Sequence, residues 1–381
     1  MIQQLRSTSR EIQRQASFRP PYCPNPCCKF HKRSGLRFYS RYGWKKIQRF
    51  PYKTRRYICT HCNKTFSFTF FFLDHRERAW GLNETIWSLF IDKSTKCSIA
   101  RRIGHSERLV RDRLSKMARF SLLKHAYLTR NLPIGEKIVY DGLENFAFSQ
   151  YDPNNINHAI GKDSLFTYDY NFSPMNRKGR MSPRQKAQKR RLERAFGPYP
   201  RDSIRTQTRR IIERLHKRCP SNVLRFLSDN HFQYRRAIQE DLASLKIMHT
   251  RVSSKIYRNY RNQLFAVNHL DMLTRHLLVP FGRETIAGSK HSIAMLEAFT
   301  LLATYKNYLR PKFLKRHKTD STAKLRSPAM EVGVAQKILS FREFFQNRVT
   351  LRQVELSEDW RNLVERKDPH SRRFIIAYNG I

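Results

Sequence analysis

The chain is poor in acidic residues and contains no long apolar segment. It has 30 Asp and Glu residues against 75 Lys and Arg, which gives a formal net charge of +45 over 381 residues. Its longest aromatic run, from Phe66 to Leu73, is far too short to cross a bilayer. The first residues, MIQQLRSTSREIQRQ, lack the apolar centre of a signal peptide. We therefore expect a cytoplasmic, nucleoid-associated protein without a membrane partner.

The excess of basic residues predicts a polyanionic partner. A charge of this size repels itself unless a counter-charged molecule neutralises part of it. Nucleic acid suits this role, because each phosphate that meets a Lys or Arg releases bound counterions. A ribosomal or other RNA-binding protein has a similar composition, so charge alone leaves the kind of nucleic acid open. The 40% apolar content indicates folded domains rather than disorder.

Cysteine is also scarce, but its distribution is uneven. Five of the seven cysteines fall in the segments YCPNPCC and YICTHC, which lie between positions 22 and 62. Two separated cysteine groups of this kind predict a tetrahedral zinc site in a zinc ribbon, here at 16–78. The expected ligands are Cys23, Cys28, Cys59 and Cys62. Cys27 is an alternative to Cys28, and His31 or His61 could replace one thiolate.

Basic and aromatic residues alternate through the rest of this predicted ribbon, which follows a basic tail at 1–15. Cations of this kind contact phosphates, and aromatic rings such as Trp44 offer stacking faces. The predicted DNA contacts in this segment are Lys45, Lys46, Arg55 and Arg56.

The segment 79–130 has the pattern of a helix-turn-helix. Asn83 can cap a first helix, Ser98 can open a second, and Gly104 permits the turn before a third helix that Ser106 caps. The third helix has apolar residues at helical spacing on one face, and its opposite face suits a DNA major groove. That opposite face carries Arg108, Arg111, Ser115 and Arg119. An ordinary helical hairpin with a solvated basic face would show the same pattern.

The segment 131–310 predicts a metal-dependent nuclease core. One strand, in KIVYD, leads into Asp141, and a later strand, in NVLRFLSD, leads into Asp229. A helix in FAVNHLDMLTRHLL then presents Asp271. Two carboxylates at strand ends and one on a packed helix are what an RNase H-like site needs to hold two Mg²⁺ or Mn²⁺ ions. Each acid alone also fits a simpler role, as a turn residue, a helix cap or a partner in a helical ion pair.

Two basic segments complete the chain. An insertion at 174–218 is expected to contain an exposed arm bearing Arg190 and Arg191, followed by a helix with an apolar face. The part at 311–381 predicts a basic linker and amphipathic helices over Ala329 to Asn347 and around Trp360, which would suit multimerisation.

Several segments resemble one protein family. These are CPNPCC, YICTHCNKTFSF, VNHLDMLTRHLLVPFGRETIAGSK, YKNYLRPKF and SPAMEVGVAQKILSFREFF, in this order between about Tyr22 and Phe345. They resemble bacterial insertion-sequence transposases with an N-terminal zinc ribbon. The resemblance implies an α/β, RNase H-like catalytic domain with an acidic triad and Mg²⁺, and homo-oligomers that bind the element's terminal inverted repeats and target DNA. By motif position Asp141, Asp229 and Asp271 match the triad, with Glu144, Glu240, Asp241 and Glu284 as alternatives.

Two functions of different classes follow from these observations. The first is an active transposase that cleaves DNA and transfers strands. The second is a transposase-derived DNA-binding regulator that has no catalytic activity. Carboxylates in the right sequence positions are compatible with both functions, so the spatial arrangement of the acids has to distinguish them.

Overall fold

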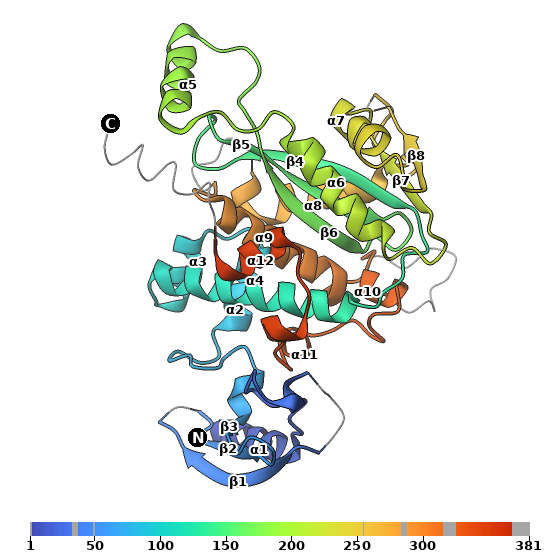
Figure 1. The fold of residues 1–381 in the computed structure, drawn as a ribbon. Helices are drawn as coiled ribbons and strands as arrows, with labels where there is room; N and C mark the ends of the chain where they lie inside the picture. The colour runs from blue at the N-terminus through green and yellow to red at the C-terminus, as the bar shows by residue number, and fades with distance from the viewer. Residues whose placement is uncertain are drawn as a thin grey trace.

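The computed structural model describes residues 2–32, 37–48, 50–253, 255–282, 288–314 and 325–367, with side chains described from residue 9. Figure 1 shows three parts stacked on one another: a small N-terminal module (residues 2–78), a layer of helices, and a mixed sheet flanked by helices. One continuous hydrophobic core extends from Leu73 to Val364 and joins the helical layer to the sheet. Among the described residues, no helix combines the length and apolar character that crossing a membrane requires.

The N-terminal module is built on a three-stranded antiparallel sheet in the order β1-β2-β3 (Tyr39–Lys46, Lys53–Cys59, Thr65–Ser67). Helix α1 (Ile2–Ser17) packs against β2, where Gln15 is fully buried and accepts a hydrogen bond from the Arg55 backbone. The segment expected as a basic tail at 1–15 therefore forms most of a helix that packs on the sheet. Charge alone suggested a solvated segment, but this helix has a partner in the sheet.

The helical layer begins with α2 (Asn83–Ile91), α3 (Lys96–Ile103) and α4 (Glu107–Thr129). Gly104 has the left-handed φ of 65° that ends α3, and the Ser106 hydroxyl caps α4, both as predicted. Thr95, rather than Ser98, caps α3. Asn83 does not act as a cap, because its side chain donates hydrogen bonds to the carboxylates of Asp74 and Glu77.

The central sheet has five strands in the order β6-β5-β4-β7-β8. Strands β4, β5 and β6 form an antiparallel meander, whereas β7 and β8 run parallel to β4. The predicted α/β class with a mixed sheet is confirmed at this level. The strands span Ile138–Phe146 (β4), Pro153–Gly161 (β5), Thr167–Pro174 (β6), Leu224–Ser228 (β7) and Ile247–Arg251 (β8).

Helices cover both faces of this sheet. On one face lies α6 (Ser203–His216), where Thr208 and Tyr140 of β4 exchange a 2.8 Å hydrogen bond. On the other face lie α8 (Phe265–Leu277) and α9 (Ser292–Thr304), and α9 also packs along α4. Between β6 and α6, helix α5 (Pro183–Phe196) projects from the body with no buried residue, as the predicted basic arm requires (Figure 1). The short α7 (Phe232–Arg236) follows β7.

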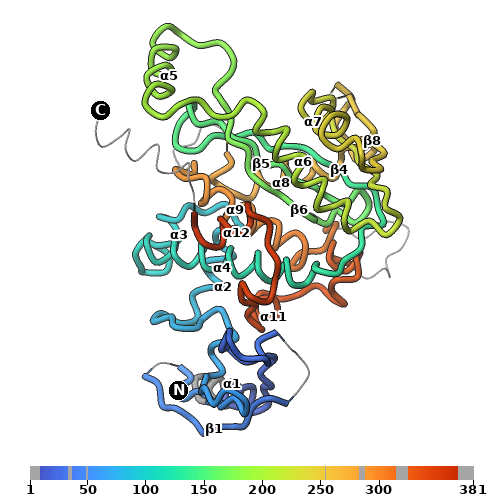
Figure 2. The backbone as a smooth tube through the Cα atoms, in the orientation of Figure 1, coloured from blue at the N-terminus to red at the C-terminus, as the bar shows by residue number. Residues whose placement is uncertain are grey.

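The C-terminal segment returns across the helical layer rather than offering a free face (Figure 2). The helix expected over Ala329 to Asn347 is two separate short helices, α10 (Pro328–Glu331) and α11 (Phe341–Phe344). Trp360 of α12 (Glu358–Glu365) is buried and donates a hydrogen bond to the Tyr170 carbonyl. These apolar residues pack into the chain's own core, so they do not support the multimerisation role that the sequence suggested.

Candidate functional site

Four cysteines meet in the N-terminal module. The ligand atoms of Cys23, Cys28, Cys59 and Cys62 all lie within 4.8 Å of one another. Two sulfur pairs are 3.7 Å (Cys23 and Cys62) and 3.8 Å (Cys28 and Cys59) apart. A tetrahedral zinc with Zn–S bonds of about 2.3 Å places its sulfurs about 3.8 Å from one another. The four sulfurs can therefore hold a zinc ion with little rearrangement.

The backbone around the cluster decides between the cysteine alternatives. Cys28 is buried beside Cys59, whereas Cys27 is exposed. The His31 ring contacts the Cys23 carbonyl through Nδ1 and the Thr350 hydroxyl through Nε2, so neither nitrogen faces the sulfurs. His61 lies closer, with Nδ1 3.5 Å from the Cys28 sulfur. Cys28 is thus the fourth member of the cluster, as preferred over Cys27.

A second cluster of candidate ligands lies at the central sheet. Asp141 belongs to β4, Asp229 directly follows β7, and β4 and β7 pair in parallel at Tyr140 and Ser228. Asp271 lies on α8, which packs on β4 and β5. The central pair of parallel strands and one helix therefore bring three aspartates from distant parts of the sequence to one region.

The electrostatics of Asp141 reflect the charges of the other two aspartates. Burial, then the negative charges of Asp271 and Asp229, raise the pKa of Asp141 to about 7. Within the part of the chain that is described, the cysteine cluster alone has three or more ligand atoms within 4.8 Å, so the aspartates do not enclose a single ion. Carboxylates that share two ions about 3.5–4 Å apart are spread more widely than those around one ion.

His158 is a member of this region that the sequence reasoning missed. It pairs with Asp141 across β4 and β5, is fully buried, and has its Nδ1 3.0 Å from the Ile156 carbonyl. Its Nε2 lies 3.2 Å from Asp271 Oδ1. Burial opposes a charge on the imidazole, but the Asp271 carboxylate outweighs burial and raises the pKa of His158. Only the strand register identifies this histidine, since its sequence context is an ordinary buried strand.

The four alternative acids named from the sequence are in ion pairs, are exposed, or lie outside the described residues. Glu240 and Asp241 both form ion pairs with Arg205 of α6. Glu144 lies on β4 with an exposed side chain, three residues beyond Asp141. Glu284 lies outside the described residues. Asp271 and Asp229 are the two acids whose charges contribute most to the raised pKa of Asp141.

Gly142, the neighbour of Asp141, is required by close packing. A Cβ at this position would overlap the side chain of Asn155, which donates a hydrogen bond to the buried Asn157. We predict that Gly142→Ala lowers the free energy of unfolding by about 1–3 kcal/mol through this overlap. Chemical denaturation measures the effect. Gly135→Ala is the matched control, because a Cβ there meets no atom within 4 Å, and an equal loss in both variants would contradict the packing argument.

The raised pKa of Asp141 also predicts a pH-dependent cost to stability. An unfolded Asp titrates near 3.8, so the folded protein loses stability as pH rises from about 4 to 7 and Asp141 ionises against its neighbours. We expect Asp141→Asn to stabilise the zinc-loaded protein, in buffer without Mg²⁺ or Mn²⁺, by about 2 kcal/mol at pH 8. This is roughly half of what the full pKa change gives, because water screens a partly exposed carboxylate. Near pH 4 the gain should vanish.

Denaturation curves at both pH values test this prediction. Asp163→Asn, in the exposed turn between β5 and β6, is the control for the change in net charge. A gain in the Asp141 variant that is equal at pH 4 and pH 8, or equal to that of the control, would mean that the carboxylates do not repel one another in the fold.

Most of the predicted DNA contacts lie on the surface. Lys45 and Lys46 of β1 are exposed, and the Arg55 and Arg56 guanidinium groups stack over Trp44 and Tyr42 at 5.0 Å. Stacking of this kind keeps both the cation and the ring at the surface of the module. Exposed residues also include Arg190 and Arg191 on the projecting α5, and Arg108 and Arg111 at the start of α4.

The predicted recognition face of α4 is only partly exposed. Ser115 is 1% exposed and its hydroxyl donates a hydrogen bond to Glu297 of α9, so Ser115 cannot contact DNA in this fold. Arg119 is half-buried, and burial lowers the pKa of its guanidinium. The sequence pattern treated α4 as a helix with one packed face. The structure packs α9 against the second face, so the fully exposed residues of α4 are confined to its first turns.

Comparison with known proteins assigns no family to this chain, so a functional assignment depends on the geometry described above. A scan against protein-family models finds no match to the chain, and a search of curated proteins finds none of significant similarity.

Proposed function

We propose that this protein is an insertion-sequence type transposase. It would bind DNA through its basic N-terminal module and the exposed cations of α4 and α5, and cleave DNA at a carboxylate metal site. The observation that carries the proposal is the convergence of Asp141, Asp229 and Asp271, expressed in the raised pKa of Asp141. A protein that only binds DNA has no need of three acids gathered in a chain of net charge +45.

The topology of the central sheet supports an RNase H-like catalytic domain. That fold has a three-stranded antiparallel meander whose first strand is central and pairs in parallel with a fourth strand, followed by a fifth. The order β6-β5-β4-β7-β8, with β7 and β8 parallel to β4, agrees with this description. Acids on the first and fourth strands, as with Asp141 and Asp229, lie on neighbouring strands and so share one side of the site.

The donor set fits divalent ions such as Mg²⁺ or Mn²⁺. All three acids supply the hard carboxylate oxygens that such ions prefer, and Asp271 Oδ1 lies 3.2 Å from Nε2 of the buried His158. Asp141, Asp229 and Asp271 would hold the ions. Bound ions of this kind supply activation of the attacking water or 3′-hydroxyl and stabilise the leaving oxygen of the phosphodiester. His158, whose Nδ1 lies beside the Ile156 carbonyl, would orient the Asp271 carboxylate through its Nε2.

The cysteine cluster supports the zinc-ribbon part of the proposal. The cluster's own hydrophobic core consists of three of the cysteines and Phe38, with four partly buried residues packed around them. Such a small core supplies little folding free energy, so a structural zinc ion would be needed to hold the strands together. The Arg55 and Arg56 guanidinium groups of β2, stacked on aromatic rings of β1, would then lie on a rigid surface, which suits contacts with DNA phosphates.

Metal-dependent nicking of DNA tests the proposal. The substrate is a duplex that carries any short inverted repeats flanking the gene, incubated with the zinc-loaded full chain and Mg²⁺ or Mn²⁺. The proposal expects nicks at the repeat ends that a chelator abolishes. Tight binding of the same duplex without nicking, under both metals, would instead identify the protein as a DNA-binding regulator. A specific observation favours keeping this second function in view: Lys306 is buried near Asp271, and although burial lowers its pKa to about 7, its protonated form would compete with a metal ion for the acids.

A further inference from the structure

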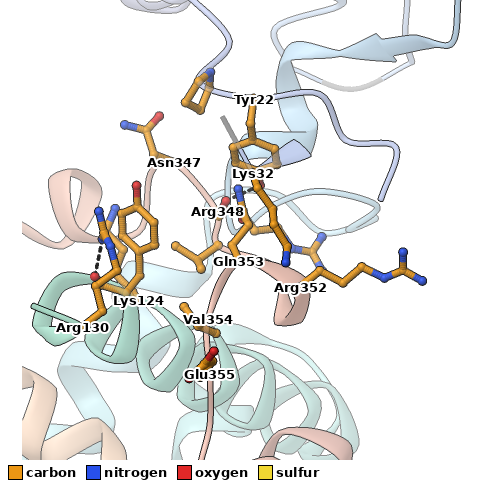
Figure 3. A pocket seen from close by; sticks show the side chains of 13 residues that line it. Tyr22, Lys32, Lys124, Arg130, Asn347, Arg348, Arg352, Gln353, Val354 and Glu355 are labelled. Atoms are coloured by element: carbon orange, nitrogen blue, oxygen red, sulfur yellow. Dashed lines mark hydrogen bonds between the residues drawn. The ribbon is translucent and has the colours of Figure 1, made fainter. Parts of the chain in front are cut away.

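A cleft of about 490 Å³ lies where the N-terminal module meets the helical layer. Figure 3 shows its lining: Tyr22 comes from the module, Lys124 from α4, Arg130 from just beyond the end of α4, and Asn347 to Glu355 from the returning C-terminal segment. That segment is tied to the module, since Gln353 Nε2 donates a 3.0 Å hydrogen bond to the His31 carbonyl and the Arg348 amide donates to the Phe71 carbonyl. The cleft is therefore formed by three parts of the chain held in fixed positions.

The charges of the lining are strongly one-sided. One carboxylate, Glu355, faces a larger group of cations. Among the described residues, no Asp or Glu forms an ion pair with any of these cations, although the structure has many ion pairs elsewhere. A concave site with several cations and one acid attracts anions and excludes other cations. The cations are Lys32, Lys124, Arg130, Arg348 and Arg352.

Two of these cations are held at a cost that a bound anion would offset. Lys124 is half-buried with its Nζ 3.0 Å from the Gln346 carbonyl, and burial lowers its pKa to about 8. The Arg348 guanidinium is also half-buried and lies 5.5 Å from the centre of the Phe70 ring. Desolvated cations without a counter-charge are unfavourable, so their retention here indicates a ligand of negative charge.

We infer that this cleft binds backbone phosphates of a nucleic acid that passes between the N-terminal module and α4. The cleft is open to solvent at Arg130 and Arg352, so a long polyanion can lie across it and meet the exposed cations of the module as well. The inference rests on the proposed function only in taking nucleic acid as the ligand. It adds a contact surface that neither the sequence motifs nor the carboxylate site contains.

Salt-dependent binding of the zinc-loaded protein to a fluorescent duplex of arbitrary sequence, in buffer without Mg²⁺ or Mn²⁺, tests the inference. The variant Arg130→Gln with Arg352→Gln removes two exposed cations of the rim. Arg225→Gln with Lys246→Gln makes the same charge change at exposed positions of the β7 and β8 edge. We expect the rim variant to bind roughly tenfold more weakly, and its slope of log K against log salt to fall by about 1 for each lost phosphate contact, whereas the control keeps its slope.

Lys124→Met, which keeps most of the side-chain packing, is a second variant, and thermal unfolding shows whether it folds.

An equal slope of log K against log salt in the rim variant, the control and the unchanged protein would overturn the inference. So would an effect on the binding of inorganic pyrophosphate with none on the duplex, because the cleft would then serve small phosphate compounds. If the unchanged protein nicks DNA while the rim variant binds normally, only the cleft assignment fails. If the unchanged protein binds no duplex, the proposed function fails as well.

Discussion

Asp141→Asn and Asp229→Asn are expected to abolish metal-dependent nicking, each lowering the rate by a factor on the order of 10³ or more. The reason is that each change removes one anionic ligand of the two metal ions, which supply several kcal/mol of transition-state stabilisation. A loss of about 4 kcal/mol corresponds to a rate lowered by a factor on the order of 10³. The substitutions keep the side-chain size, so the strands should fold unchanged. The rate of nicking of the repeat-containing duplex, measured in Mg²⁺ and in Mn²⁺, gives the result.

Glu240→Gln is the matched control for these variants. Glu240 is an acid in the same region of the sequence as Asp229, but it is exposed and ion-pairs with Arg205 and Arg236. It should retain nicking, and all variants should retain binding to the duplex. Nicking by Asp141→Asn at the rate of the unchanged protein would remove the carboxylate site from the proposal. Asp271→Asn should behave like the other two aspartate variants, and full activity in it would point to a different third ligand.

Cys59→Ser is expected to release the zinc ion and unfold the N-terminal module. Structural zinc in small modules contributes about 10–16 kcal/mol of binding free energy, which exceeds the stability that a core of this size supplies. Zinc content, measured by mass spectrometry of the intact protein, should fall from one ion per chain to none. Binding to the repeat ends should weaken more than binding to arbitrary duplex, because α5 and α4 keep their exposed cations.

Cys27→Ser supplies the control, because Cys27 is adjacent to Cys28 in sequence but exposed and outside the cluster. It should keep both zinc and DNA binding. Zinc content unchanged in Cys59→Ser would show that the four sulfurs are not the ligands. Loss of zinc in Cys27→Ser would instead show that the two neighbouring cysteines exchange roles in the folded protein.

The pattern of local sequence predicts elements well in this chain. Ser182 and Gly197 mark the ends of α5, and Ser106 marks the start of α4, because capping depends on residues within one turn of the helix end. Each of the strands that lead into Asp141 and Asp229 was also expected from its apolar run. Capping at Asn83 was wrong, since two carboxylates from the preceding loop attract its amide.

Contacts between segments that are far apart in the chain could not be predicted from the sequence. The buried Ser115, the core position of Trp360 and the packing of α1 on β2 all involve contacts between segments far apart in the chain. An exposed polar face and a face packed against a distant helix give the same local pattern. The basic cleft is a further example, because its cations come from three segments and no motif links them.

The sequence by itself determined the strong basic charge, the two cysteine groups, the positions of most helices and strands, and the association of Asp141 and Asp229 with two of these strands. These properties depend on composition and on neighbours within a few residues. Only the tertiary structure decided that Cys28 rather than Cys27 joins the cluster, that His158 lies between two of the aspartates, and that α4 has a second packed face. Such outcomes depend on strand register and on contacts between remote segments, and no local pattern encodes which remote segment will be the partner.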